Sequence, residues 1–344
     1  MKVGLLLATS TGGVGAHVRS LAAGLVARGH EVTVVGPPAT EELFGFSSTG
    51  ARFSPTHGRL DVRAVRSRGV EVLHAHGLRA GLLGGLAKGR TPLVVTWHNA
   101  VLDGEHGPAA RHALALGERI VARRASVTLA ASDDLADRAR ALGARDVRVA
   151  PVALDPPPPT RDRDQVRAEL GLAPTDRLLL TVARLHPQKA LEVLIEAATG
   201  WPDAVVAIAG DGPLHATLTA QIAATHAPVR LLGRRSDVPD LLAAADLAVL
   251  PSRWEARSLF AQEALRAGIP LVATAVGGLP GLLGDGAELV PAGDVGALRH
   301  AVAELLADDT ARTALVARGR ARAAAWPTER DTLDQVVGVY AALL

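Results

Sequence analysis

Two glutamates, Glu255 and Glu263, lie within the stretch SRWEARSLFAQEALRAGIPLVATAVGG at residues 252–278. The apolar run before this stretch predicts a strand, so Glu255 falls in the loop that follows it. A helix is expected to begin near Ser258, which puts Glu263 in its second turn. A carboxylate accepts hydrogen bonds from two neighbouring hydroxyls, so this pair could hold both the ribose and the hexose of a nucleotide-sugar. Candidate donors to an anion or a hydroxyl are the amides at the helix start, those of Arg257, Ser258 and Leu259.

Two cations stand in a comparable position in the stretch TVARLHPQKALEVLIEAA, residues 181–198. An apolar strand leads into a loop at Arg184, and Lys189 follows near the start of a helix. Beside helix amides, such cations can neutralise a diphosphate, because arginine offers a planar fork and lysine a mobile point charge. A salt-bridged surface pair is the alternative interpretation of this motif taken alone.

Glycine-rich loops add weaker candidates. The stretch TSTGGVGAHV joins the first strand to the first helix through Gly12, Gly13 and Gly15. Glycines there let the backbone approach a phosphate, although a plain tight turn explains them equally well. No acidic residue ends the second strand, VTVVGPP, where a dinucleotide site would have one. Further along, the loop of Gly233 and Arg234 could offer backbone groups to a base edge.

Two acidic patterns have local structural interpretations. Asp211 in AGDGP is expected to cap the next helix. The DRD at 162–164 imitates an Asp-x-Asp metal motif, but it follows prolines and not a strand. We therefore expect a helix N-cap there, and no metal site.

Apolar segments of strand length recur along the chain, each followed by a segment of helical period. This alternation predicts two doubly wound, Rossmann-like α/β domains, each with a parallel sheet between two layers of helices, facing each other across a cleft at the carboxyl ends of their strands. The first-domain strands are expected at 3–8, 31–35, 71–74, 93–97, 127–130 and 147–149. The second-domain strands are expected at 178–182, 205–209, 229–231, 247–250, 271–273 and 288–290.

Domain boundaries follow from the connector LDPPPPTRDRD at 154–164, whose prolines exclude a helix or a central strand. The N-terminal domain is then 1–153, expected to bind an acceptor, and the C-terminal domain is 165–327, expected to bind the nucleotide-sugar. The segment 328–344 is expected to be a helix with Thr328 as its N-cap. It could close the second domain or pack back on the first.

The amino-acid composition limits which kinds of site and partner the chain can have. The 344 residues include no cysteine, which excludes disulfides, thiolate metal sites and cysteine nucleophiles and fits a reducing, cytoplasmic compartment. No apolar run is long enough to span a bilayer. The net charge is only +2, and no nucleic-acid partner is expected. Positive charge is concentrated in the first half, so an anionic or lipid-linked acceptor and peripheral contact with the inner face of the membrane are candidates. The arginines proposed for this contact are Arg52, Arg59, Arg63, Arg66 and Arg68. A solvated arginine-rich face is the favoured alternative interpretation.

Seven stretches in register carry a family resemblance: GGVGAHV, HAHG, VVTWHN, VARLHPQKALEVLIEA, AGDGP, LLGRRSDVPDLLAAAD and PSRWEARSLFAQEALRAGIPLVATAVGGLP. Over nearly its whole length the chain resembles the retaining GT-B glycosyltransferases of family 4. The resemblance implies that Arg184 and Lys189 bind the donor diphosphate. It further implies that Glu263 binds the ribose and Glu255 the transferred sugar, and that Gly13 binds phosphates from the other domain. His98 would lie beside the reacting face of the sugar.

The same resemblance implies a retaining transfer in which the departing diphosphate of a UDP- or GDP-sugar takes the proton of the acceptor hydroxyl. No metal cofactor would be required, because fixed positive charge stabilises the leaving group. The chain departs from the family pattern where Arg257 and Ser258 replace Phe-Gly, where Ala190 replaces glycine, and where 151–153 lack Pro-Asn-Gly. These departures put the donor sugar in doubt more than the activity.

His74 and His76 alternate onto one strand face beside His98. Three histidines could hold a metal, but we favour a polar acceptor pocket that uses His76 and His98. Other functions stay open: an NDP-sugar epimerase, a nicotinamide-dependent oxidoreductase, or a non-catalytic nucleotide-sugar-binding protein. The missing ribose acid argues against the oxidoreductase. The intact cations and glutamates argue against the non-catalytic protein.

Overall fold

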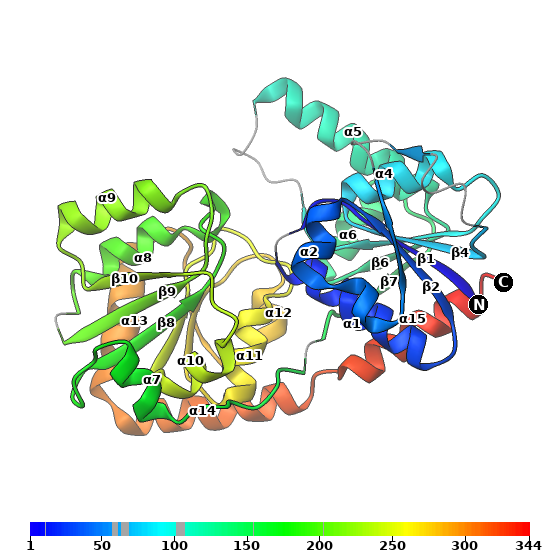
Figure 1. The fold of residues 1–344 in the computed structure, drawn as a ribbon. Helices are drawn as coiled ribbons and strands as arrows, with labels where there is room; N and C mark the ends of the chain where they lie inside the picture. The colour runs from blue at the N-terminus through cyan, green and yellow to red at the C-terminus, as the bar shows by residue number, and fades with distance from the viewer. Residues whose placement is uncertain (11, 57–60, 63–68, 101–106, 154, 202) are drawn as a thin grey trace. The chain divides into compact units, whose positions relative to one another are not determined.

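The computed structural model describes residues 1–10, 12–56, 61–62, 69–100, 107–153, 155–201 and 203–344. The chain divides into two compact units, in which Met1–Ala153 joins Pro327–Leu344 and Leu154–Trp326 stands by itself. We refer to them as the N-terminal unit and the C-terminal unit. Each contains one parallel sheet with helices packed against it (Figure 1).

The N-terminal unit has a seven-stranded sheet in the order β3-β2-β1-β4-β5-β6-β7. The chain winds outward from β1 on one side and then returns to build the other side, which is the doubly wound arrangement. Every residue of β4 is buried, as expected for a parallel strand covered on both faces. The strands are β1 (Lys2–Leu7), β2 (Glu31–Gly36), β3 (Arg52–Pro55), β4 (Val72–His76), β5 (Leu93–Trp97), β6 (Val127–Ala130) and β7 (Val147–Val149).

The last helix of the chain belongs to this unit. Thr328 caps α15 in a capping box, as predicted, and α15 packs against α1. The fully buried Tyr340 of α15 bonds through its hydroxyl to Nδ1 of His74 at 2.6 Å. The helices of the unit are α1 (Gly13–Ala27), α2 (Pro38–Phe44), η1 (Phe46–Thr49), α4 (Leu78–Ala87), α5 (Pro108–Arg124), α6 (Asp133–Ala141) and α15 (Glu329–Ala341).

The C-terminal unit repeats the design with a six-stranded sheet in the order β10-β9-β8-β11-β12-β13. Side chains of β8 alternate between two cores: Leu179 faces α8 and α13, whereas Leu178 and Leu180 face α10 and α11. The strands are β8 (Arg177–Val182), β9 (Ala204–Ala209), β10 (Val229–Gly233), β11 (Leu247–Leu250), β12 (Leu271–Thr274) and β13 (Glu288–Val290). The helices are α7 (Arg163–Glu169), η2 (Pro187–Lys189), α8 (Leu191–Ala198), α9 (His215–Thr225), α10 (Val238–Ala244), α11 (Leu259–Ala267), α12 (Leu279–Leu283), α13 (Val295–Ala307) and α14 (Asp309–Ala324).

The predicted fold class is confirmed, since both units are Rossmann-like parallel sheets and every strand expected from the apolar runs is present. The strand that the sequence did not predict is β3. Its four residues, RFSP, are short and partly polar, and they pair only with β2 at the edge of the sheet. An edge strand needs little apolar patterning, so periodicity does not detect it.

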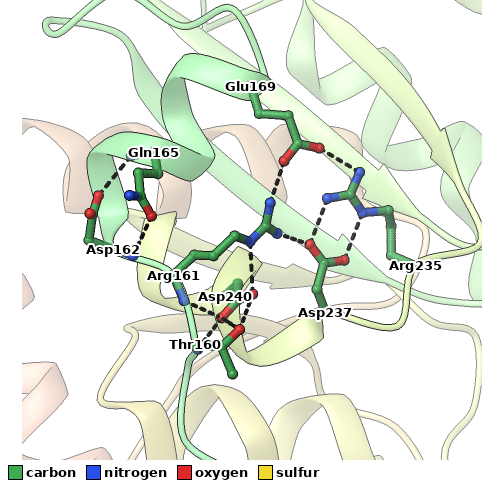
Figure 2. A network of polar contacts seen from close by, with 8 residues as sticks. All are labelled: Thr160, Arg161, Asp162, Gln165, Glu169, Arg235, Asp237 and Asp240. Carbon is green, nitrogen blue, oxygen red and sulfur yellow. Dashed lines mark hydrogen bonds and ion pairs between the residues drawn. The ribbon is translucent and has the colours of Figure 1, made fainter.

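Polar contacts fix the end of the proline-rich connector to the C-terminal unit (Figure 2). The buried Asp240 of α10 accepts hydrogen bonds from the backbone amides of Thr160 at 2.6 Å and Arg161 at 3.2 Å. The Arg161 side chain bonds to Asp240 as well, and it pairs with Asp237, which Arg235 also holds. Asp162 then caps α7 in a capping box with Gln165, so the N-cap interpretation of DRD is confirmed.

The hydrogen bonds of Asp240 predict how the stability of the protein depends on pH. The Thr160 amide, helped by Arg161, lowers the pKa of Asp240 to about 2. A depressed carboxyl pKa contributes stability above the unfolded-state pKa and loses it as the pH falls through the folded value. We therefore expect Asp240→Asn to lower the urea midpoint at pH 7, and this difference to shrink below about pH 4 and vanish near pH 2. Asp285→Asn, at an exposed position, is the control. An equal deficit of Asp240→Asn at pH 7 and pH 2 would contradict the assignment.

Candidate active site

The predicted cation and the first predicted glutamate meet in the C-terminal unit. The strands β8 and β11 are parallel neighbours, so the loops at their carboxyl ends leave the sheet side by side. The Nζ atom of Lys189 forms an ion pair with Oε1 of Glu255, and the Ser252 hydroxyl donates to the same oxygen at 2.7 Å. Glu255 is only 6% exposed. The salt-bridge interpretation thus holds for Lys189, but its partner is the buried sugar-binding candidate.

Backbone and amide contacts tie these two loops together. The amide of Arg253 donates to the Gln188 carbonyl at 2.8 Å, and Nε2 of Gln188 donates to the Trp254 carbonyl at 2.9 Å. Ala190, which follows Lys189, is the N-cap residue of α8 and lies in the left-handed region with φ of +48°. That conformation costs an L-residue about 1–2 kcal/mol, so the backbone requirement of the family glycine is present here and is met by alanine.

The GGLP turn supports Glu255 from its other side. The amide of Gly278 donates to the Glu255 carbonyl at 2.8 Å. Gly277 has φ of +53°, and a Cβ at this position would overlap the carbonyl oxygen of Glu255. The turn therefore needs glycine in order to pack against the loop, and Glu255 is held through both its main chain and its side chain.

Arg184 lies in an exposed part of the loop after β8. Its side chain takes part in no hydrogen bond or ion pair with the residues that the structure describes, so it is available to a ligand. The backbone around it is fixed, because the Ala183 amide donates to Ala209 and the Leu185 amide to Asp211, each at 3.0 Å. Gly210, with φ of +149°, permits this approach, since a Cβ there would overlap the Ala183 carbonyl.

The capping prediction for Asp211 is wrong. Helix α9 begins at His215 after Leu214, and no side chain caps it. Asp211 instead accepts from the amide of Gly212 at 2.7 Å. The amide of Leu214 donates to the Leu185 carbonyl at 3.1 Å, so contact with the Arg184 loop delays the start of the helix.

Glu263 lies in α11, which begins as predicted: the Ser258 hydroxyl caps the helix by accepting from the Ala261 amide at 3.3 Å. Burial raises the pKa of Glu263 to about 7. None of the hydrogen bonds and ion pairs found among the described residues involves its carboxylate. A carboxyl group desolvated without a partner is typical of a functional site.

The remaining donor-binding candidates of the C-terminal unit lie in different local environments. The guanidinium of Arg257 lies 5.7 Å from the centre of the Trp326 ring, and burial, with Arg266 and Arg322 nearby, lowers the pKa of Arg257 to about 10. Leu259 is the first residue of α11. Gly233 has φ of +66° and accepts from the Gly210 amide at 2.7 Å, which brings this loop beside the Arg184 loop; Arg234 is exposed.

The N-terminal unit brings its histidine candidates together. His76 ends β4 and His98 follows β5, its parallel neighbour, and the two share a hydrogen bond of 3.1 Å between Nδ1 and Nε2. His17 of α1 joins them, although the sequence analysis did not single it out. Its only sequence signal is its place within GGVGAHV. Burial, reinforced by neighbouring histidines, lowers the pKa of His76 and His98 well below the ordinary value.

The remaining predicted residues are spread over the same unit. Gly13 is exposed at the first position of α1, and the neighbouring Ser10 hydroxyl accepts from the Gly15 amide at 3.0 Å. Arg52 is exposed at the start of β3. The other arginines proposed for an anionic surface, Arg59, Arg63, Arg66 and Arg68, lie outside the described residues. Across the described helices, none combines the length and apolarity that crossing a bilayer requires.

Comparison with known families accounts for both units. Residues 162–322 match the model of the glycosyl transferases group 1, and residues 12–155 match that of the glycosyl transferase 4-like domain. Together the two matches span most of the chain, so both units resemble glycosyltransferase domains. The first match covers every candidate of the C-terminal unit, and the second covers Gly13, His76 and His98.

Curated glycosyltransferases also resemble the chain. The D-inositol 3-phosphate glycosyltransferases of Mycobacterium bovis and Mycobacterium tuberculosis are 34% identical over 310 residues. The alignment covers 82% of the chain but 64% of the length of these relatives.

Solved structures show the same GT-B fold. The Anabaena protein HepE, solved with UDP-glucose, has a TM-score of 0.87 at 22% identity, covering 99% of this chain and 100% of that one. Sucrose-phosphate synthase from Thermosynechococcus elongatus has a TM-score of 0.82 at 20% identity, covering 99% and 98%. At these identities the likeness concerns the fold.

Proposed function

We propose that the protein transfers a sugar from a nucleotide-diphosphate sugar to an acceptor hydroxyl with retention of configuration. The observation that carries this proposal is the pairing of Lys189 with Glu255 at the ends of adjacent strands, with the unpaired Arg184 in the same loop as Lys189. The two cations can neutralise a diphosphate, and the Glu255 carboxylate can accept hydrogen bonds from sugar hydroxyls. The two loops therefore supply groups for both parts of the donor. Glu263 adds a second carboxylate for the ribose.

Each candidate has a role. Arg184 and Lys189, with the amides at the start of α11, stabilise the charge that develops on the leaving diphosphate. Gly13 contributes to phosphate binding at the start of α1. Glu255 accepts from hydroxyls of the transferred sugar. His98 and His76, which are buried and uncharged, accept or donate hydrogen bonds to the acceptor.

The reaction proceeds on one face of the sugar. The bond between the anomeric carbon and the diphosphate oxygen breaks, and the acceptor oxygen bonds to the same face of that carbon. The acceptor proton moves to the departing diphosphate, so no protein base is needed. The fixed cations make a metal unnecessary for this step, and transfer is expected to continue in EDTA.

Two comparisons support the choice of substrates. HepE was solved with UDP-glucose, which supports a UDP-sugar donor, with a GDP-sugar as the second candidate. The curated relatives are named for D-inositol 3-phosphate, which supports an anionic acceptor.

A panel of UDP-, GDP- and ADP-sugars tests this function by thermal stabilisation, since a ligand that binds the folded state raises the unfolding temperature. One nucleotide class should stabilise the wild type and fail to stabilise Arg184→Ala. Product analysis then separates the alternatives: an epimerase releases an epimerised donor without acceptor, and a binding protein leaves the donor intact. Absence of stabilisation by every donor would overturn the proposal.

We also propose peripheral membrane contact through the neighbouring helices α4 and α5. Large apolar side chains are exposed there at Leu86, Leu116 and Ile120, and Arg123 and Arg124 end α5. Apolar side chains beside basic ones favour an anionic bilayer surface.

Flotation with vesicles checks this contact. We expect the wild type to float with vesicles that contain phosphatidylglycerol, and Leu116→Glu to lose at least half of the bound fraction. Leu344→Glu is the matched control, because Leu344 is 62% exposed and Leu116 is 60% exposed. Equal flotation of all three proteins would exclude this surface.

A further inference from the structure

Three buried imidazoles from different elements of the N-terminal unit converge on one point. They belong to His17 of α1, His76 at the end of β4 and His98 after β5. Their ring centres form a nearly equilateral triangle, with separations of 5.5 Å from His17 to His76, 5.4 Å from His17 to His98 and 5.4 Å from His76 to His98. One ring nitrogen of each lies within 4.8 Å of those of the other two.

A triangle of this size fits a metal ion. With metal–nitrogen bonds of about 2.1 Å and tetrahedral angles, ligand nitrogens lie about 3.4 Å apart and imidazole centres about 5 Å apart. The 3.1 Å between Nδ1 of His76 and Nε2 of His98 is already close to the first value. The third nitrogen lies within 4.8 Å of these two, so metal binding requires it to move closer.

Hydrogen bonding distinguishes His76 from its neighbour His74. Both nitrogens of the neighbouring His74 are satisfied, Nδ1 by Tyr340 and Nε2 by Thr96, each at 2.6 Å. His76, which is 3% exposed, has its Nε2 without a hydrogen-bond partner in the part of the chain that the structure describes. Hydrogen bonds therefore do not satisfy His76 completely, and its candidate ligand atom is the other nitrogen, Nδ1, which lies 3.1 Å from Nε2 of His98.

The chemistry of the three imidazole ligands limits which metal ions this site would bind. Neutral imidazole is the form that coordinates metals, and all three rings are buried. The chain has no cysteine, and the described neighbours at this point offer nitrogen ligands. Imidazole suits Zn²⁺, Co²⁺, Ni²⁺ and Cu²⁺, whereas Mg²⁺ and Ca²⁺ prefer oxygen.

We propose that His17, His76 and His98 bind one transition-metal dication of the Zn²⁺ and Co²⁺ type through three imidazole nitrogens. The fourth coordination position is open to water or to an oxygen of a small molecule, as in exchangeable three-histidine zinc sites. The site goes beyond the proposed transfer, which needs no metal.

Cobalt spectroscopy tests the site without donor or acceptor, so its failure would not affect the proposed transfer. The full chain, treated with EDTA and dialysed, is titrated with CoCl₂. Tetrahedral Co²⁺ shows intense visible d–d absorption, and we expect this band to saturate at one equivalent and to disappear when ZnCl₂ is added.

Variants identify the ligands. His17→Gln and His98→Gln should each weaken Co²⁺ binding at least tenfold and remove the band, with folding verified by circular dichroism. His300→Gln is the matched control, because the exposed His300 lies 3.2 Å from Glu304 and could bind an adventitious ion. It should leave the band unchanged. Absence of the band in the wild type, its persistence in both ligand variants, or its loss in His300→Gln would overturn the proposal.

Discussion

Replacing Lys189 by alanine is expected to lower kcat/KM for the donor about 10²–10³-fold, the effect of removing one preorganised group that stabilises charge in the transition state. The fold should survive with a lowered unfolding midpoint, because the change leaves the buried Glu255 carboxylate with Ser252 as its remaining side-chain donor. Steady-state kinetics with the donor found in the panel measure the effect. Arg184→Ala is expected to reduce activity similarly with an unchanged unfolding midpoint, because its exposed side chain bonds to none of the described residues.

The matched control is Arg177→Ala. Arg177 begins β8, so this change removes a cation from the opposite end of the strand that leads to Arg184. It should stay within about twofold of the wild type, since screened surface charges contribute little. If Lys189→Ala keeps near-wild-type rates, or if Arg177→Ala is equally damaged, the assignment of the diphosphate site is wrong.

Replacing Glu263 by glutamine should separate stability from function. Burial raises the pKa of this carboxyl from 4.5 to about 7, so ionising it in the folded protein is costly. The penalty is absent below about pH 4.5, grows as the pH rises to 7 and is complete above it, at an upper limit of about 3 kcal/mol. Glu263→Gln should therefore be more stable than the wild type at pH 8 in urea unfolding, and equally stable near pH 4.5.

Donor binding should show the opposite trend. In the proposed complex, ribose hydroxyls donate to the ionised carboxylate, so a donor must expel the proton below pH 7, and affinity is expected to fall towards tenfold per pH unit there. Isothermal titration of the wild type between pH 5.5 and 8.5 measures this slope. Glu263→Gln should bind weakly at every pH and should abolish turnover, whereas Glu288→Gln, exposed on β13, should match the wild type. A wild-type affinity that does not change with pH would contradict the role of Glu263.

Local sequence patterns predicted the elements that carry the site. Apolar runs placed Glu255 directly after a strand, and the serine at 258 marked the start of α11, because both signals arise from neighbouring residues. The capping predictions for Asp162 and Thr328 were confirmed for the same reason.

Features that depend on strand order could not be predicted in this way. Lys189 and Glu255 are 66 positions apart and meet because β8 lies next to β11. Asp211 does not cap α9, because a hydrogen bond from the Leu214 amide to the Leu185 carbonyl sets where the helix begins. Leu185 lies in a different loop, so local sequence does not reveal this contact. The place of His17 in the histidine cluster depends on which face of α1 packs towards β4. A single histidine in a helical segment does not predict that face.

The ion pair between Lys189 and Glu255 also predicts that the ligand-free protein binds inorganic phosphate weakly. An inorganic phosphate that drew the ammonium away would leave a buried carboxylate uncompensated, at a cost of several kcal/mol. A nucleotide-sugar offers anionic oxygens to one partner and hydroxyls to the other, so the exchange leaves neither alone. The protein should thus discriminate its substrate from the abundant phosphate of a cell before any chemistry begins. Competition of phosphate against the donor in a binding assay should therefore be weak, and strong competition would show that the pair gives no such protection.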